Sequence, residues 1–261
     1  MNEGAKRSFG CGCGAILAVI VVIALVGWSL SFLPGPIQVI PKEPIPDNVP
    51  PAAGAEVPEI DVHAPGRTSD KLSFWAAPIA ESTKIPEPAV RAYGNAELIA
   101  ADAWPQCNLK WNTLAGLGWV ETRHGSYTGN FFDGASIDEN GFVTPPIIGI
   151  PLDGSPGVAK VPDTDRGELD GDSEFDRAVG PLQFIPESWQ RYGLDANGDG
   201  EANPHQIDDA ALGAAHHLCD NGRDLSTPQG WTEAVMSYNR SQEYLVDVRD
   251  AAANYAIQQP A

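Results

Sequence analysis

One carboxylate in this 261-residue sequence stands where it could act as an acid catalyst. Glu121 ends the segment LAGLGWVE (residues 114–121), in which no other side chain carries a charge. Burial beside Trp119 and Val120 is expected to raise the pKa of this carboxyl group, because an apolar environment disfavours the charged form. A general acid that works at neutral pH needs such a pKa. The alternative is a structural glutamate that ends the helix and pairs with Arg123.

A second group of polar residues has the spacing of a calcium-binding loop. The segment DANGDG (residues 195–200) places oxygen-bearing side chains at positions 1, 3 and 5 of an EF-hand loop: Asp195, Asn197 and Asp199. Glu201 could add its backbone carbonyl, and Gly200 suits the sharp turn. The usual glutamate at position 12 is replaced by Gln206. Ca²⁺ is the favoured ion because all donors are hard oxygens, and an Asx-rich turn without an ion is the alternative.

Helical patterns surround these residues, so we predict a mainly α fold with a loop-rich middle. Helices are predicted over 88–103, 109–121, 186–192, 208–219, 231–238 and 241–257. Asn108 is the expected cap of the helix that carries Glu121. Residues 130–176 form a long Gly/Pro/Asp segment, whose acidic part receives no metal assignment. His124 is expected to be a surface or hydrogen-bonding histidine.

The N-terminal part predicts a membrane anchor and a spacer. The uncharged run 15–33 is long enough to cross the hydrocarbon core as a helix, and the basic residues before it place residues 1–14 in the cytoplasm. A cleavable signal peptide is the alternative, which would release the protein. Residues 34–68 are rich in proline and predict a semi-rigid linker, so the domain is expected over 69–261, outside the membrane.

An exported domain with two lone cysteines predicts a disulfide between Cys107 and Cys219. Closing this loop would stabilise the fold by roughly 4–5 kcal/mol in the chain-entropy model. A cysteine nucleophile is the competing hypothesis, but neither cysteine lies in a nucleophile motif. The formal net charge of -19 argues against a nucleic-acid partner, because phosphate binding relies on clustered Lys and Arg.

Three motifs in order carry a resemblance to a known family. VETRHG, AVGPLQFIPESW and AVMSYN resemble the lysozyme-like lytic murein transglycosylases, in particular the membrane-bound lytic transglycosylase B type in its exported actinobacterial form. The similarity runs from about Ser69 to the C-terminus. It implies that the partner is peptidoglycan and that the enzyme cleaves the bond between N-acetylmuramic acid and N-acetylglucosamine, leaving a 1,6-anhydro ring.

The resemblance also implies roles for individual residues. Glu121 would be the single catalytic carboxylate, first as the acid and then as the base. Gln183 would line the sugar cleft, and Tyr238 and Asn239 would position the sugar. In the family the calcium loop is longer and ends at an acid before a helical alanine, a place that Asp209 fills here.

Three other functions stay open at this point. A hydrolytic muramidase would need a second carboxylate about 5–5.5 Å from the first if retaining, or ~6.5–9.5 Å if inverting. The candidates for it are Asp133, Glu174 and Asp176, which have no motif support. A non-catalytic cell-wall-binding or division scaffold would not need Glu121, Gln183 and Tyr238 intact. A calcium-dependent interaction protein would be expected to repeat the acidic loop, and this sequence does not.

Overall fold

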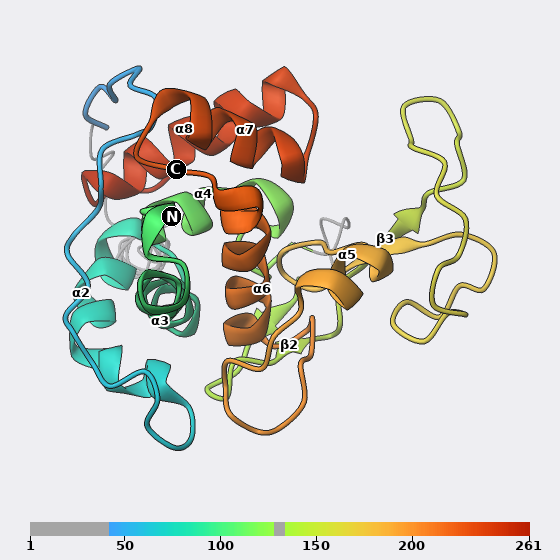
Figure 1. Ribbon diagram of the computed structural model, residues 1–261, viewed down its shortest axis with the longest axis horizontal. Helices are drawn as coiled ribbons and strands as arrows, with labels where there is room; N and C mark the ends of the chain where they lie inside the picture. The colour runs from blue at the N-terminus through green and yellow to red at the C-terminus, as the bar shows by residue number, and fades with distance from the viewer. Residues whose placement is uncertain (1–41, 128–133) are drawn as a thin grey trace, which may run out of the picture. The chain divides into compact units, whose positions relative to one another are not determined.

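Seven α-helices form the core of the part of the chain that the computed structural model describes, residues 42–127 and 134–261 (Figure 1). Residues 43–261 belong to one unit. Within the described ranges, each helix is too short or too polar to span a bilayer. The predicted anchor at 15–33 lies outside these ranges, as does Asp133. The prediction of a mainly α fold is confirmed.

The predicted helices are present with small shifts at their ends. They are α3 (Glu87–Ala103), α4 (Trp111–Thr122), α5 (Pro186–Tyr192), α6 (Ile207–Cys219), α7 (Pro228–Tyr238) and α8 (Gln242–Ala256). The prediction that Asn108 caps α4 is wrong. Asn108 adopts a left-handed conformation with φ 53°, and Lys110 is the residue that precedes the helix. A further helix, α2 (Ser73–Thr83), follows the short 3₁₀ helix Thr68–Leu72 and contains Pro78.

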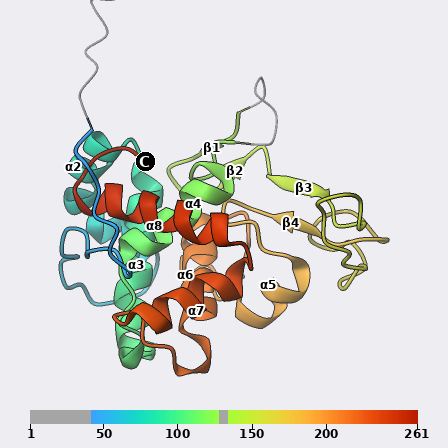
Figure 2. The same cartoon turned by 90° about the horizontal axis from the view of Figure 1, so that it is seen from above.

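The core forms where the helices pack in pairs. α4 packs mainly against α8, and α3 packs mainly against α6 (Figure 2). Gly116 permits the first of these contacts, since a Cβ atom there would lie 2.6 Å from the backbone oxygen of Val248. Trp111 and Trp231 are fully buried in the same core. This packing fixes α4, whose last turn carries Glu121.

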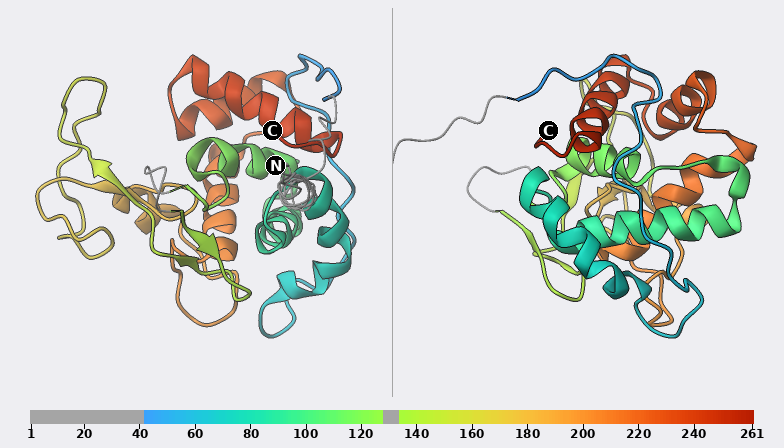
Figure 3. Two further views of the ribbon diagram at one scale, coloured as in Figure 1. Left: turned by 180° about the vertical axis from the view of Figure 1, so that it is seen from behind. Right: turned by 90° about the vertical axis from the view of Figure 1, so that its left-hand side faces the viewer.

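Residues 43–67, here called the N-terminal strap, run in extended form across the helices (Figure 3). The strap is anchored at α4: the Trp111 indole N–H donates to the Ala55 carbonyl at 2.9 Å, and the Asn112 amide donates to the Ala52 carbonyl at 2.9 Å. Val57 is buried against the core. The unit therefore begins at Glu43, earlier than the residue 69 expected from composition, and the second half of the expected linker packs on the domain.

The long middle segment contains two small antiparallel sheets. β1 (Ser136–Ile137) pairs with β2 (Val143–Thr144), with Ser136 opposite Thr144. β3 (Ile148–Pro151) pairs with β4 (Arg177–Val179), with Ile148 opposite Val179. We call residues 148–179 the acidic arm, which extends away from the helices (Figure 2). Aspartates hold its turns together by accepting backbone N–H bonds, as Asp165 does from Gly167 and Leu169.

Candidate active site

The last turn of α4 brings Glu121 to a place where the chain changes direction. Three successive residues, Arg123, His124 and Gly125, have φ values of 53°, 59° and 78°, so the helix stops directly after Thr122. Glu121 itself is partly buried. The side chain is thus held at the end of a rigid, buried helix rather than in a free loop.

Tyr244 of α8 donates a hydrogen bond to Glu121, with 2.5 Å between its hydroxyl and Oε1. Burial raises the pKa of Glu121 to about 7, and the bond from Tyr244 lowers it in part. A carboxyl group with this pKa is substantially protonated at neutral pH, so it can donate a proton there. The sequence motifs do not include Tyr244, which the fold brings to Glu121 across 123 positions of sequence.

The segment Gly180–Phe184 turns sharply beside this helix end. Gly180 and Gln183 have φ values of 75° and 48°. Three side chains hold three successive carbonyls of the turn. Gln183 Nε2 donates to Gly180 at 2.9 Å, Thr122 to Pro181 at 2.6 Å, and Tyr238 to Leu182 at 2.7 Å. The three sequence motifs therefore meet at this turn.

Tyr238 ends α7, and its hydroxyl reaches the turn. Its pKa is raised, first by burial and then by the negative charge of Glu121, which places the two groups near each other. Asn239 follows directly after the helix and is exposed. The structure thus gathers Glu121, Gln183 and Tyr238 around one place, with Asn239 at its edge.

His124 is fully buried, so of the two expectations for it, a surface or a hydrogen-bonding histidine, the second is confirmed. Its two ring nitrogens lie 3.1 Å from the Tyr93 hydroxyl and 2.8 Å from the Tyr255 hydroxyl. Burial lowers the pKa of His124 to about 3, so the ring is uncharged at neutral pH. Gly118 is required beside this group, because a Cβ atom there would collide with the Tyr93 hydroxyl.

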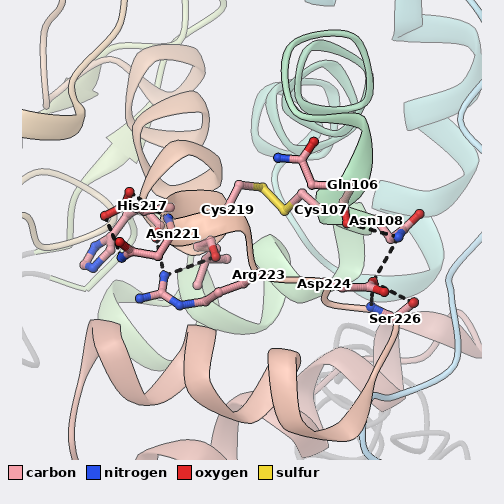
Figure 4. Close-up of a disulfide and its surroundings, with 11 residues drawn as sticks. Gln106, Cys107, Asn108, His217, Cys219, Asn221, Arg223, Asp224 and Ser226 are labelled. Atoms are coloured by element: carbon pink, nitrogen blue, oxygen red, sulfur yellow. Dashed lines mark hydrogen bonds between the residues drawn. A yellow bond between two sulfur atoms is a disulfide. The ribbon is translucent and has the colours of Figure 1, made fainter.

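Cys107 and Cys219 form the predicted disulfide, with their Cα atoms 5.3 Å apart (Figure 4). It joins the short helix before α4 to the last turn of α6. The guanidinium of Arg223 donates to the His217 carbonyl at 2.9 Å and so closes the same helix end. The disulfide therefore fixes the end of α6 relative to the start of α4, and the bond from Arg223 closes the end of α6 itself.

The side chains of the predicted calcium loop form hydrogen bonds with the backbone of the same loop. Asp195 accepts bonds from Gly198 and Gly200, both at 2.7 Å, and Asp199 accepts one from Glu201 at 2.9 Å. Asn197 and Asp199 are joined by a side-chain bond of 2.9 Å. Both carboxylates thus accept bonds from the backbone of the loop itself, which is the pattern of an Asx-rich turn.

Asp209 reaches this loop from the first turn of α6. Its carboxylate accepts bonds from the backbone N–H groups of Ala196, Asn197 and Asn203 at 2.8, 3.2 and 2.9 Å. Burial raises its pKa to about 6. The position that the resemblance gives to Asp209 is thus adjacent to the loop in space.

Among the described residues, a different set of carboxylates converges most closely. Oxygens of Asp163, Asp165 and Asp176, all in the acidic arm, lie within 4.8 Å of one another. Both carboxylate oxygens of Asp176 accept hydrogen bonds from Thr164, one from its backbone N–H at 2.8 Å and one from its hydroxyl at 2.7 Å. These bonds make the group a structural element of the arm.

A known protein family matches the part of the chain that carries two of the predicted site residues. Residues 167–246 match the family described as Transglycosylase SLT domain, and this range contains Gln183 and Tyr238. The match supports the predicted enzyme class, a peptidoglycan lytic transglycosylase. The chain is also similar to the Escherichia coli lytic transglycosylase Slt35 solved in complex with bulgecin A, at 13% identity and a TM-score of 0.42, covering 90% of this chain and 83% of that one. None of the curated proteins matches the sequence.

Proposed function

We propose that the chain cleaves the β-1,4 bond between N-acetylmuramic acid and N-acetylglucosamine in peptidoglycan and leaves a 1,6-anhydro ring. The observation that carries this proposal is the partly buried Glu121 with a pKa of about 7, set beside Gln183 and Tyr238 of the matched domain. We also propose, from the motifs alone, that the enzyme is of the membrane-bound B type in its exported actinobacterial form.

Glu121 would act twice in this reaction. In its protonated form it donates the proton to the glycosidic oxygen as the bond from that oxygen to C1 of the muramic acid breaks. The resulting carboxylate then accepts the proton of the C6 hydroxyl, whose oxygen forms the new bond to C1. Glu121 ends the cycle protonated, and no water is consumed. A pKa near neutrality serves both steps, because proton donors and acceptors work best when their pKa is close to the ambient pH.

The placement of the other acids favours one carboxylate over two. Both oxygens of Asp176 are used within the acidic arm, and Asp176 is fully buried. Glu174 is an exposed residue of the same arm, whose backbone carbonyl accepts the N–H of Asp163 at 3.1 Å. Of the two candidates that the structure describes, neither is a free carboxylate beside Glu121.

Gln183 and Tyr238 would hold the sugar. One N–H of Gln183 is occupied by Gly180, which leaves its oxygen and second N–H for acetamido and hydroxyl groups. Gly149 of β3 lies beside the Gln183 oxygen, since a Cβ atom on Gly149 would approach it to 3.3 Å. The root of the acidic arm therefore forms part of the surroundings of Gln183.

The test is a digestion of purified sacculi with the protein comprising residues 43–261, followed by mass spectrometry of the released muropeptides. Products lighter by one water than the hydrolysed form support the proposal. Reducing-end products would instead identify a muramidase, and release of no product by a protein that still binds the glycan would identify a wall-binding scaffold.

We further propose a structural Ca²⁺ at the loop, with Asp195, Asn197, Asp199, the Glu201 carbonyl and Asp209 as ligands. The donor chemistry fits, because all five groups offer oxygen and the three loop side chains occupy alternate positions. The ion would join the loop to the start of α6. No step of the reaction is assigned to it.

The proposed location is the cell membrane, with residues 15–33 as a single-pass anchor, the N-terminus in the cytoplasm and the domain outside. This proposal is supported by the apolar run and by the Cys107–Cys219 disulfide, which belongs to oxidising compartments.

A further inference from the structure

A row of stacked rings leads from the end of α3 to Tyr238. Trp104 stacks on His216, with centroids 4.9 Å apart, and the edge of His216 meets Tyr192 at 5.3 Å. Tyr192 stacks on His217 at 4.3 Å with an interplanar angle of 6°. His217 in turn stacks on Tyr238 at 5.1 Å and 29°. His217 is thus held between two tyrosine rings, one of which belongs to the candidate site.

The ring of Tyr238 is fixed in three ways. One face rests on His217, and its edge meets Phe184 at 5.7 Å and 72°. Its hydroxyl donates to the Leu182 carbonyl at 2.7 Å, in the turn that carries Gln183. Removal of His217 would leave the face of the ring without support, while the other two contacts remain.

His217 is itself fixed by the end of α6 (Figure 4). Its carbonyl accepts the bond from Arg223, and the disulfide at Cys219 holds the chain two residues further on. The side chain therefore projects from a helix end that is tied at two points. A ring placed this firmly can set the orientation of its neighbour.

The ring of His217 is uncharged at neutral pH. Burial is the main cause that lowers its pKa to about 4, and Arg223, Arg191 and His216 lower it further against the opposing effect of Asp220. A cation next to Tyr238 would stabilise the carboxylate form of Glu121, lower its pKa and so leave less of the protonated form to donate a proton at neutral pH. A neutral aromatic ring at this position supports Tyr238 without that effect.

We propose that His217 is a positioning residue that orients Tyr238 toward the sugar bound beside Glu121. This inference rests on the proposed function. Since Tyr192 and Tyr238 are both stacked on His217, the property required of residue 217 is a flat ring of similar size. The imidazole nitrogens have no part in the role.

The experiment compares H217F, H217A and the control H216A with the wild type, all as residues 43–261. His216 belongs to the same row but has no stacking contact with Tyr238. We expect H217A to lower kcat/KM for muropeptide release about tenfold, the effect of losing one aromatic contact. The kcat/KM of H217F should stay within about twofold of the wild-type value. H216A should keep its activity, although its melting temperature should fall by about as much as that of H217A.

A second measurement does not depend on catalysis. In protein labelled at the tyrosine rings, the NMR signals of Tyr238, assigned with Y238F, should broaden or shift in H217A and return in H217F. Equal loss of activity in H217F and H217A would overturn the proposal and assign a direct role to the imidazole. Unchanged Tyr238 signals in H217A would overturn it as well. If the wild type releases no anhydro product, the proposed function fails, but the NMR comparison still decides whether His217 fixes Tyr238.

Discussion

The hydroxyl of Tyr244 and Oε1 of Glu121 are 2.5 Å apart, and they come from the two helices that pack together most extensively, α8 and α4. A donor to the carboxylate stabilises its charged form and so opposes the effect of burial. The acid strength of Glu121 therefore depends on how α8 lies against α4.

Replacing Tyr244 by Phe should shift the pH dependence of the reaction. A general acid works in its protonated form, so activity falls as the pH rises through the Glu121 pKa of about 7. The bond from Tyr244 lowers this pKa. Its loss raises the pKa, and the alkaline limb of the kcat/KM profile should move to higher pH. Y255F, which removes a tyrosine hydroxyl bonded to His124 instead, should leave the limb in place.

Replacing Glu121 by Gln should lower the release of anhydro-muropeptides by about 10²–10⁴-fold, the usual contribution of a general acid or base. The amide has nearly the same shape but cannot transfer the proton. Circular dichroism and thermal melting should show the fold intact. E243Q, which changes an exposed glutamate of α8, serves as the control and should retain full activity. Full activity of E121Q would contradict the catalytic assignment.

Replacing both Cys107 and Cys219 by Ala should reduce the free energy of unfolding by roughly 4–5 kcal/mol, because the disulfide closes a loop with a sequence separation of 112. Denaturant titration with and without a reducing agent measures the effect. The reduced wild type should resemble the double variant. A loss below about 1 kcal/mol would show that the unfolded chain gains little freedom when the bond is absent.

The N-terminal strap should be needed for stability. Arg67 at its end pairs with Asp208, whose side chain is fully buried, at 2.7 Å. R67M leaves that carboxylate without its charged partner and should cost about 3–5 kcal/mol. The double variant R67M/D208N removes both charges and should recover most of the loss. A protein starting at residue 69 should be destabilised at least as much as R67M, which a comparison of melting temperatures with residues 43–261 would show.

Addition of Ca²⁺ to the chelator-treated protein should raise its melting temperature, because an ion that binds the folded state alone stabilises it. D195N and D199N should lose this response. D163N, in the acidic arm, is the matched control that separates the loop from the convergent carboxylates there. A melting temperature that stays the same across a titration from micromolar to millimolar Ca²⁺ would contradict the proposed site.

Local sequence predicts the helices whose ends are marked by proline or glycine. α5 begins at Pro186 and ends before Gly193, as expected, because proline favours a first helical turn and glycine ends one. α2 was not predicted, since Pro78 stands inside it and its apolar residues show no clear helical spacing. The strap was expected to be free because its composition is that of a spacer. Specific contacts such as the one between Trp111 and Ala55 decide otherwise, and composition does not show them.

Some residues of the candidate site can likewise be predicted from the sequence, and others cannot. Glu121, Gln183 and Tyr238 lie in short motifs that can be found in the sequence. Tyr244 lies outside the three motifs, and its role arises from the packing of α8 on α4. Thr122 lies in VETRHG, but the motif does not show that its hydroxyl holds the turn at Pro181. Such partners depend on tertiary contacts across long stretches of chain, which residue types and spacing do not determine.

Hydrogen bonds join the N-terminal end of the folded unit directly to its C-terminal end. The side-chain amide of Gln259 accepts the N–H of Glu43 at 2.8 Å and donates to its carbonyl at 2.9 Å. Glu43, the first residue of the unit, and Gln259, close to its other end, therefore lie side by side. This is the geometry of a module that can be inserted into a loop of a host protein without separating the two halves of the host.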